Sequence, residues 1–358
     1  MKKLVWALLV FMGACLVANG QHKTQNLVIV TLDGMRWQEI FGGVDTAIMG
    51  NKKFTKDSAG IAKQFWSADE QGRRQKLFPF LWGTVQQQGQ LYGNRNAGSY
   101  VNVANRYWFS YPGYNEIFTG YPDSAINSNN KVLNPNENVL EFINEQKGYA
   151  GRVAAFTTWD CFPFIFNKQR SGIYVNADID TLHFNDASLK LINDMQFLMA
   201  KPINVRPDAL TYFAGREYLK AYRPKVLYIA FDETDDFAHA GQYDQYIKSA
   251  HAEDGMLADL WQTIQAMPGY KNNTTLIITC DHGRGDKVKS QWTSHGSNIA
   301  GADQIWVAAI GPDTSPMGEV TNIAQLYQRQ LATTFAALLG FRFSPQHPTA
   351  QAIQSILH

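Results

Sequence analysis

Residues 26–32 read NLVIVTL, a continuous apolar run that leads straight into Asp33 and Gly34. An apolar run of this length without alternation is typical of a strand that is covered on both faces. Similar short runs recur at 152–158, 225–231, 275–280 and 305–310. Helical patterns separate them, at 138–145, 187–200, 208–222, 243–266 and 321–339. We therefore predict an α/β fold with a doubly wound, mostly parallel sheet flanked by helices.

Three of these predicted strands run directly into acidic residues. Asp33 follows the first strand, Asp235 lies shortly after the run 225–231, and Asp281 follows the run 275–280. In open α/β sheets, ligands bind at the carboxyl ends of the strands, so these side chains are expected at one edge of the sheet. A cluster of unpaired carboxylates is electrostatically unfavourable, and bound cations are the simplest remedy.

Histidines accompany two of these three acidic segments. His239 lies four residues after Asp235, which places both on one face of a helix, and His282 is adjacent to Asp281. His295 lies on a polar loop further along the chain. Mixed carboxylate and imidazole ligands suit Zn or Mn better than Ca or Mg. His251 and Asp254, in the predicted helix 243–266, are interpreted instead as surface residues.

The order of these motifs resembles the alkaline phosphatase superfamily, most closely its nucleotide pyrophosphatase/phosphodiesterase branch. The motifs that carry the resemblance are Asp33, the segment 112–120 (PGYNEIFTG), Asp235 with His239, the Asp281-His282-Gly283 triplet and His295. They extend over nearly the whole chain after residue 20. The resemblance implies the fold described above and a site for two divalent metal ions, Zn first and Mn second.

The resemblance also implies which residues hold each metal ion. Asp33, Asp281 and His282 would bind one metal together with the residue at the nucleophile position, and Asp235, His239 and His295 would bind the other. Two metal ions a few ångströms apart can stabilise both the attacking and the leaving oxygen of an in-line phosphoryl transfer.

Glu116 departs from the family pattern. Branch members carry Thr or Ser three residues before the final Thr-Gly of the segment, and this chain has Glu116 there. Three interpretations are open. Glu116 ligates the metals while a metal-bound hydroxide attacks, Glu116 itself attacks to form an acyl phosphate, or catalysis is lost and the domain only binds a ligand.

Three further polar residues are candidates for binding the substrate. Arg36 and Arg284 follow the acidic motifs closely and can donate two hydrogen bonds to phosphate or sulfate oxygens. Surface salt bridges explain both arginines equally well. Asn115 is a further candidate for contacting the substrate at the rim of the site.

The composition excludes some classes of protein. The 358 residues carry 32 Lys and Arg against 31 Asp and Glu, a net charge of +1, and 45% are apolar. Such a chain can bury a large core, and no basic excess suggests binding to a nucleic-acid duplex. The expected partner is a small phosphorylated or sulfated substrate.

The first twenty residues have the pattern of a signal peptide. Lys2 and Lys3 precede an apolar run at 4–17, and small residues end at Gly20, so residues 21–358 are predicted to form a single exported domain, periplasmic or secreted. Lipid attachment at Cys15 is the less favoured alternative. No later stretch is long and apolar enough for a transmembrane helix. Cys161 and Cys280 are interpreted as buried packing residues, and a bridge between them is left open.

The sequence thus predicts an exported two-metal hydrolase of phosphate esters, with phosphodiesterase chemistry as the first choice. A sulfatase or phosphotransferase on the same scaffold is the nearest enzymatic alternative. A non-catalytic, metal-dependent binding protein is the alternative from another class, because Glu116 replaces the usual hydroxyl residue.

Overall fold

The computed structural model describes residues 23–199 and 205–357. The predicted signal peptide and Cys15 lie outside the described residues. The described chain forms an eight-stranded sheet in the order β10-β2-β9-β7-β1-β6-β4-β5, with a small three-stranded sheet in the order β11-β3-β8 beside it. The prediction of a mostly parallel α/β sheet flanked by helices is confirmed.

The centre of the large sheet consists of parallel strands with wholly buried residues. β1 (Asn26–Leu32) pairs with β6 (Val226–Phe231) on one side and β7 (Thr274–Thr279) on the other. β4 (Val153–Thr157) and β5 (Tyr174–Ala177) extend the sheet beyond β6. Both faces of β1 are buried, as its continuous apolar sequence predicts, so the strand ends alone are left to carry polar groups.

The other edge of the large sheet is antiparallel and short. β9 (Val307–Ile310) pairs antiparallel with β7 and with β2 (Gln90–Tyr92), and β10 (Gly318–Glu319) pairs parallel with β2. The predicted strand 305–310 is divided, because Ile305 belongs to β8 (Gln304–Ile305) of the small sheet. β3 (Val101–Asn102) and β11 (Leu326–Tyr327) complete that sheet.

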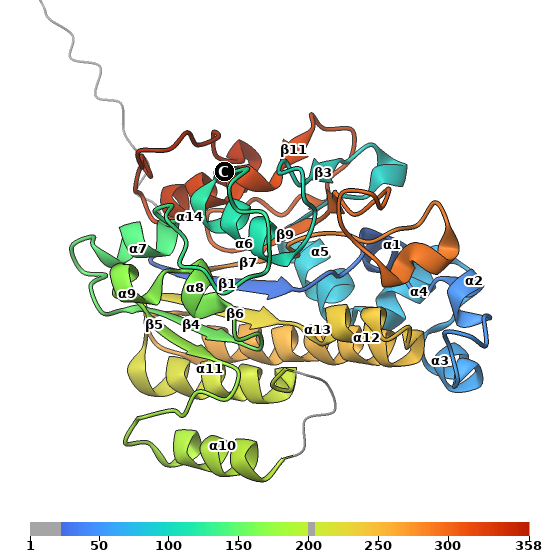
Figure 1. The fold of residues 1–358 in the computed structure, drawn as a ribbon, viewed down its shortest axis with the longest axis horizontal. Coiled ribbons are helices and arrows are strands. Elements are labelled where there is room, and N and C mark those ends of the chain that lie inside the picture. The colour runs from blue at the N-terminus through green and yellow to red at the C-terminus, as the bar shows by residue number, and fades with distance from the viewer. Residues whose placement is uncertain (1–22, 200–204, 358) are drawn as a thin grey trace, which may run out of the picture.

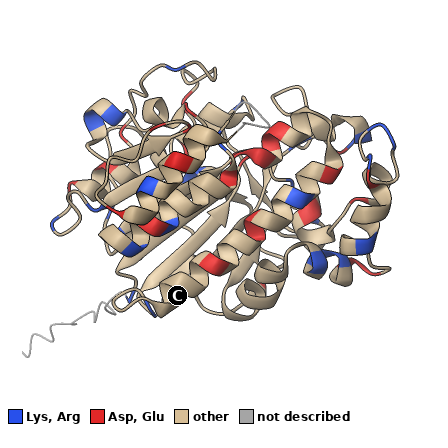
Figure 2. Ribbon diagram, turned by 90° about the horizontal axis from the view of Figure 1, so that it is seen from below, with Lys and Arg blue, Asp and Glu red and all other residues tan. Residues whose placement is uncertain are grey.

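Helices cover both faces of the large sheet, with α11 and α13 on one side and α6, α7 and α14 on the other (Figure 1). The helices are α1 (Trp37–Gly42), α2 (Thr46–Met49), α3 (Ser58–Phe65), α4 (Glu70–Leu77), α5 (Gln86–Gln88), α6 (Ser110–Thr119), α7 (Val139–Asn144), α8 (Phe162–Ile165), α9 (Lys168–Ser171), α10 (Ala187–Leu198), α11 (Asp208–Tyr222), α12 (Glu233–His239), α13 (Tyr243–Ala266) and α14 (Leu331–Leu338). Acidic and basic segments are interspersed over the helices in Figure 2. Within the described residues, no helix has the length and apolar character needed to cross a membrane.

Two sequence interpretations are wrong at the level of local structure. The helix predicted at 321–339 is limited to α14, because Leu326 instead donates its backbone N–H to Tyr100 and joins the small sheet. Asp254 is not a surface residue. Its buried carboxylate accepts hydrogen bonds from the backbone N–H groups of Phe80 and Leu81, at 2.7 and 3.1 Å. These bonds hold the segment at residues 80–81 against α13.

Cys161 and Cys280 are both buried, and both are free thiols in the structure. Cys280 ends the segment that leads from β7 to Asp281, so its burial is part of the packing beneath the strand ends.

Candidate functional site

The site lies where β1, β6 and β7 end. These strands are adjacent in the sheet, in the order β7-β1-β6, so the residues that follow them meet at one edge. Asp33 follows β1, α12 with Asp235 and His239 follows β6, and Asp281 with His282 follows β7. Two groups of side chains there have ligand atoms within 4.8 Å of one another, Asp33 with Asp281 and His282, and Asp235 with His282 and His295.

The first group is almost entirely buried. His282 Nε2 lies 3.4 Å from Asp33 Oδ1 and 3.4 Å from Asp281 Oδ2. The remaining carboxylate oxygens accept hydrogen bonds that orient them, from the Tyr114 hydroxyl to Asp33 and from the Gly34 backbone N–H to Asp281. Asp33 Oδ1 and Asp281 Oδ2 are buried without any hydrogen-bond donor in the described chain. Such orphaned oxygens are what a bound cation would satisfy.

The second group surrounds Asp235. His239 Nε2 lies 3.1 Å from Asp235 Oδ2 and 2.8 Å from His295 Nε2. His282 Nε2 lies 3.7 Å from Asp235 Oδ1, so one imidazole adjoins both groups. The structure therefore brings together all six of the predicted Asp and His ligands.

The tautomer of His282 follows from its hydrogen bonding. Its Nδ1 lies 3.0 Å from the carbonyl oxygen of Gly283, which can only accept, so Nδ1 carries the proton. Burial lowers the pKa of His282 to about 4, so the ring is neutral near pH 7. Nε2 then presents a lone pair toward carboxylate oxygens, an arrangement that favours a metal ion between them.

The carboxylates of the first group repel one another. Burial raises the pKa of Asp33 well above its usual value, and the neighbouring charges of Asp281 and Asp235 raise it further. Burial likewise raises the pKa of Asp281, with Asp235 adding to the shift. Burial, and then the neighbouring His282, lower the pKa of His295 to about 2. In the absence of a cation, this cluster disfavours its own charges.

Arg284 does not reach outward to a substrate. Its side chain is wholly buried, and Nη2 donates to both the carboxylate and the backbone oxygen of Asp235. Burial raises the pKa of Asp235, but the Arg284 guanidinium, together with His239 and His295, holds that pKa well below the usual value. Gly34 permits this approach, since a Cβ there would lie 2.7 Å from Asp235 Oδ1 and 2.9 Å from Arg284 Nε. Arg284 thus holds in place the side chain of Asp235, one of the candidate metal ligands.

Arg36 and Asn115 are engaged elsewhere. Arg36 is buried, with Nε 3.0 Å from Glu39 Oε2 and Nη1 donating to the backbone of Gly285. Asn115 donates to the backbone of Tyr121 and accepts from the Asn134 side chain. Neither side chain has a free donor directed at the cluster, so both contribute to packing around the site.

Both oxygens of the Glu116 carboxylate likewise accept hydrogen bonds from the surrounding chain. It accepts the backbone N–H groups of Ala104, Asn105 and Arg329 at 2.7 to 3.1 Å, and the Asn105 side chain at 3.0 Å. Burial raises its pKa to about 7 although the hydrogen bonds act in the opposite sense. Among the described residues, Glu116 belongs to neither group of potential ligands. Its contacts join α6 to the loop at residues 104–105 and to the short 3-10 helix at residues 328–330.

Ser110 is the functional candidate that the sequence reasoning missed. It is the first residue of α6, and its Oγ lies 3.5 Å from His282 Nε2. Gly113 lets this end of α6 approach β7 closely, because a Cβ there would lie 2.5 Å from the carbonyl oxygen of Asp281. The available signal was a serine two residues before Pro112, since proline is favoured in the first turn of a helix.

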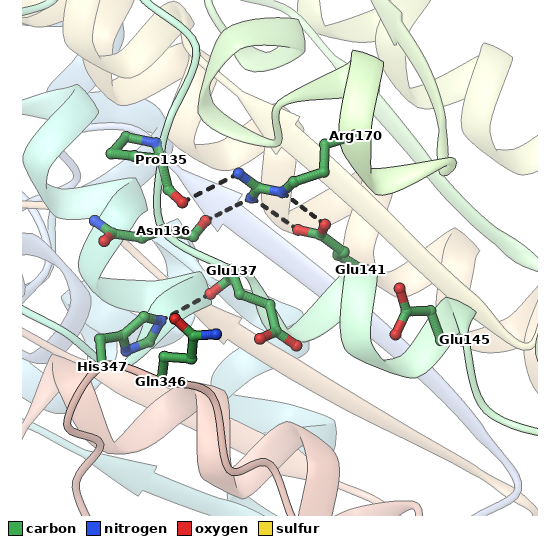
Figure 3. A pocket seen from close by; sticks show the side chains of 8 residues that line it. All are labelled: Pro135, Asn136, Glu137, Glu141, Glu145, Arg170, Gln346 and His347. Carbon is green, nitrogen blue, oxygen red and sulfur yellow. Dashed lines mark hydrogen bonds and ion pairs between the residues drawn. The ribbon is translucent and has the colours of Figure 1, made fainter.

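Ser110 and Asp235 both line a cavity of about 320 Å³ that opens beside the cluster. A larger cavity of about 690 Å³ lies at another part of the molecule, between the segment 135–145 and residues 346–347 (Figure 3). There, Arg170 donates two hydrogen bonds to Glu141, and further bonds to backbone oxygens of Pro135 and Asn136. Arg170 and Glu141 are thus paired with each other, whereas the oxygens of Asp33 and Asp281 lack a donor in the described chain, so the candidate active site is the smaller cavity.

The sequence profile of the type I phosphodiesterase / nucleotide pyrophosphatase family matches residues 44–300. The chain belongs to this family. The match includes Ser110, Asp235, Asp281 and His295, whereas Asp33 lies before it and is placed by β1. No protein among those with curated descriptions matches the chain.

Several solved structures share the fold. Alkaline phosphatase PafA is 9% identical with a TM-score of 0.64, over 94% of this chain and 99% of that chain. BT1596, a 2-O GAG sulfatase, is 11% identical with a TM-score of 0.58, over 93% and 74% of the two chains. The lipoteichoic acid synthase LtaP from Listeria monocytogenes is 13% identical with a TM-score of 0.56, over 91% and 74%. Family and fold together support a phosphoester hydrolase or a sulfatase.

Proposed function

We propose that this protein is an exported hydrolase of phosphate esters that uses two divalent metal ions, with a preference for phosphodiesters. The observation that carries the proposal is the pair of ligand groups that share His282, with Ser110 Oγ 3.5 Å from that shared imidazole. The metal ions are proposed to be Zn²⁺, with Mn²⁺ as the alternative.

The residues present fit such a pair of ions. Asp33, Asp281 and His282 would hold one, with Ser110 beside it, and Asp235, His239 and His295 would hold the other. Two bound cations would compensate the carboxylates, polarise the phosphoryl oxygens and favour ionisation of a nearby hydroxyl. The orphaned oxygens of Asp33 and Asp281 support this assignment independently of the family.

Ser110 is the proposed nucleophile. Its place at the start of α6 puts the reacting phosphoryl group next to backbone N–H groups and the positive end of the helix. Ser110 Oγ loses its proton to solvent and attacks phosphorus. The leaving oxygen takes the electron pair of its P–O bond and a proton from solvent, so the group departs as an alcohol. Water then attacks the phosphoserine, which releases a phosphomonoester and restores the hydroxyl.

The remaining residues of the site position these groups. Arg284 fixes Asp235, and the Gly283 carbonyl fixes the ring of His282. Glu116 anchors α6 through backbone donors at 104–105 and 329, so that Ser110 keeps its place. The interpretations with Glu116 as ligand or nucleophile are less favoured, since its oxygens already have partners.

The experiment compares three p-nitrophenyl substrates, the phosphodiester bis(p-nitrophenyl) phosphate, the monoester and the sulfate, with protein loaded with Zn²⁺ or Mn²⁺. The proposal expects turnover of the diester above the monoester, and loss of turnover after chelation. Faster hydrolysis of the sulfate would favour the sulfatase alternative. A loaded protein that cleaves none of the three would favour a binding protein.

Export is a separate part of the proposal and rests on residues 1–20. Secretion from a bacterial host, followed by amino-terminal sequencing of the mature protein, is expected to give Gln21 as the first residue. Lipid attached to Cys15 would favour the lipoprotein alternative, and an intact Met1 on cytoplasmic protein would contradict export.

A further inference from the structure

Two helices beside the candidate site begin without a side chain of their own that caps them. α11 follows Pro207 and α12 follows Asp232, and neither of these side chains accepts a backbone N–H of its helix. Each helix instead receives a carboxylate from the other. Asp208 of α11 accepts the backbone N–H groups of Asp232 and Glu233, and Glu233 accepts the backbone N–H of Asp208 at 3.0 Å. This exchange between Asp208 and Glu233, the double cap, fixes α12 against α11.

A third acidic side chain, Glu253 of α13, is buried against the double cap. Glu253 is 1% exposed, and neither of its oxygens has a hydrogen-bond donor among the described residues. Ser249, one helical turn earlier, donates its hydroxyl to Glu233 at 3.0 Å, so this face of α13 meets the double cap. Asp208 lies within hydrogen-bonding reach of Glu253, where α11 and α13 run side by side (Figure 1). Glu253 therefore meets an acceptor and no donor.

Two carboxyl groups in contact form a hydrogen bond only if one of them carries a proton. Both oxygens of Asp208 already accept hydrogen bonds, from the Thr158 hydroxyl and from the two backbone N–H groups of the double cap. A proton on either oxygen would oppose these donors. The oxygens of Glu253 have no such donors, so the proton belongs on Glu253.

The surrounding charges act in the same sense. Burial raises the pKa of Glu253 well above its usual value, and the charges of Asp208, Glu233 and Asp232 raise it further. Burial and then the charge of Glu233 raise the pKa of Asp208, but the hydrogen bonds that Asp208 accepts lower it. Arg206 is the base whose charge acts on Asp208, and its own hydrogen bonds go to neutral oxygens. A second negative charge beside Asp208 would thus lack a paired cation.

We propose that Glu253 is protonated in the folded protein and donates a hydrogen bond to Asp208, so that a neutral carboxyl group supports the double cap. The pair acts on the candidate site through α12, which carries Asp235 and His239. Glu253 is thus a positioning residue for the second group of metal ligands. Its proton is independent of the proposed function, whereas its effect on metal binding rests on that function.

The first test compares the pH dependence of stability in metal-free protein and in its Glu253→Gln variant, which keeps a neutral donor. Folded Glu253 retains a proton that an unfolded glutamate loses near pH 4.5, so this group makes the free energy of unfolding fall as the pH rises above that value. In Glu253→Gln, folding between pH 6 and 8 should take up about one proton fewer per chain. The same pH dependence in both proteins would overturn the inference.

Asp254 offers a matched control, because it is equally buried and both of its oxygens accept backbone N–H groups. At pH 8, Asp254→Asn and Asp208→Asn should each lower Tm by a few degrees, since an amide places a donor against N–H groups of the chain. Glu253→Gln should leave Tm unchanged or raise it. A stable Asp208→Asn protein beside an unstable or unfolded Glu253→Gln protein would place the proton on Asp208 and overturn the assignment.

Infrared difference spectra at pH 7 observe the proton directly. The Glu253→Gln variant should lack one C=O band of a neutral carboxyl group that the unchanged protein shows. Loss of carboxylate bands instead would show that Glu253 is ionised and would overturn the inference. A bound metal ion beyond the proposed two that disappears in Glu253→Gln would also overturn it, because a cation would then occupy the place of the proton.

The effect on the site is tested with Glu253→Leu, which removes the donor but keeps an apolar side chain of similar size. One of the two Zn²⁺ equivalents should bind several-fold more weakly in this variant, as measured by calorimetry, and Glu253→Gln should restore the affinity. Equal Zn²⁺ affinity in all three proteins would overturn the positioning role. If the unchanged protein binds no Zn²⁺, the proposed function fails, while the infrared spectra still decide whether Glu253 carries the proton.

Discussion

In the cavity drawn in Figure 3, Glu141 faces Arg170 at 2.7 and 2.9 Å, and the guanidinium also donates to three backbone oxygens of residues 134–136. At the ends of β1, β6 and β7, Asp33 and Asp281 face each other across His282, and each leaves an oxygen without a donor in the described chain. Both regions are acidic.

The difference lies in how the charge is compensated. The Glu141 carboxylate is paired within the chain, and its ion pair with Arg170 ties α7 to α9. The strand-end site has an excess of acidic groups over basic ones, which a bound cation would compensate. Acidic composition alone does not distinguish these two regions, whereas the buried oxygens of Asp33 and Asp281 that lack a donor do.

The largest effect is expected from Ser110→Ala. Removing the nucleophile should lower kcat for phosphodiesters by roughly 1,000-fold or more, because the covalent path is lost while the metal ligands remain. Steady-state kinetics with parallel metal analysis measures both quantities. Turnover within a few-fold of the unchanged protein would show that hydroxide, and not Ser110, attacks the phosphorus.

The two acidic regions should respond oppositely to neutralisation. Asp281→Asn is expected to reduce metal binding and to abolish most of the rise in Tm that added Zn²⁺ produces. In chelated protein the same change should be neutral or stabilising, because it removes a repulsive charge. Thermal unfolding with Zn²⁺ and with chelator tests this.

Glu141→Gln is the matched variant in the paired region. It should destabilise the protein by about 1–3 kcal/mol with and without metal, because the buried Glu141 side chain loses its charge-assisted hydrogen bonds to Arg170. An equal response of the two variants to Zn²⁺ would remove the distinction between the regions.

Glu116→Gln separates anchoring from metal binding. The variant should lose about 1–3 kcal/mol of stability at pH 8, since an amide accepts fewer of the four hydrogen bonds and adds an unmatched donor. Metal content should stay unchanged. Loss of one metal equivalent in a folded Glu116→Gln protein would restore Glu116 as a ligand.

A smaller effect is expected in the pH dependence of metal binding. The raised pKa values of Asp33 and Asp281 mean that a metal ion must displace protons, so apparent affinity should increase with pH. The pKa values of His282 and His295, lowered to about 4 and 2, exclude these two imidazoles as the source of those protons above pH 5. Calorimetry in two buffers of different ionisation enthalpy measures proton release, and identical heats in both would contradict it.

The sequence predicted the parts of the site that depend on single strands. Continuous apolar runs identified β1, β6 and β7, and the first polar residues after them supplied Asp33, Asp235 and Asp281. Parallel strands align their carboxyl ends, so the meeting of these residues follows from the topology.

The parts that depend on contacts between distant segments were not predictable in this way. Ser110 reaches His282 because Gly113 packs against the backbone of Asp281, a contact across more than 150 residues of sequence. Glu116 was assigned to the nucleophile position by counting back from Thr119 and Gly120, and its true partners at 104–105 and 329 could not be read from that segment.

The most direct test of the central claim is the metal stoichiometry of the purified protein. Elemental analysis after loading with Zn²⁺ and removal of free metal should give two equivalents per chain, and about one for Asp235→Asn. Chelation should abolish phosphodiester hydrolysis, and Zn²⁺ should restore it. A protein that binds no divalent metal, or that hydrolyses the diester equally well after complete chelation, would contradict the account.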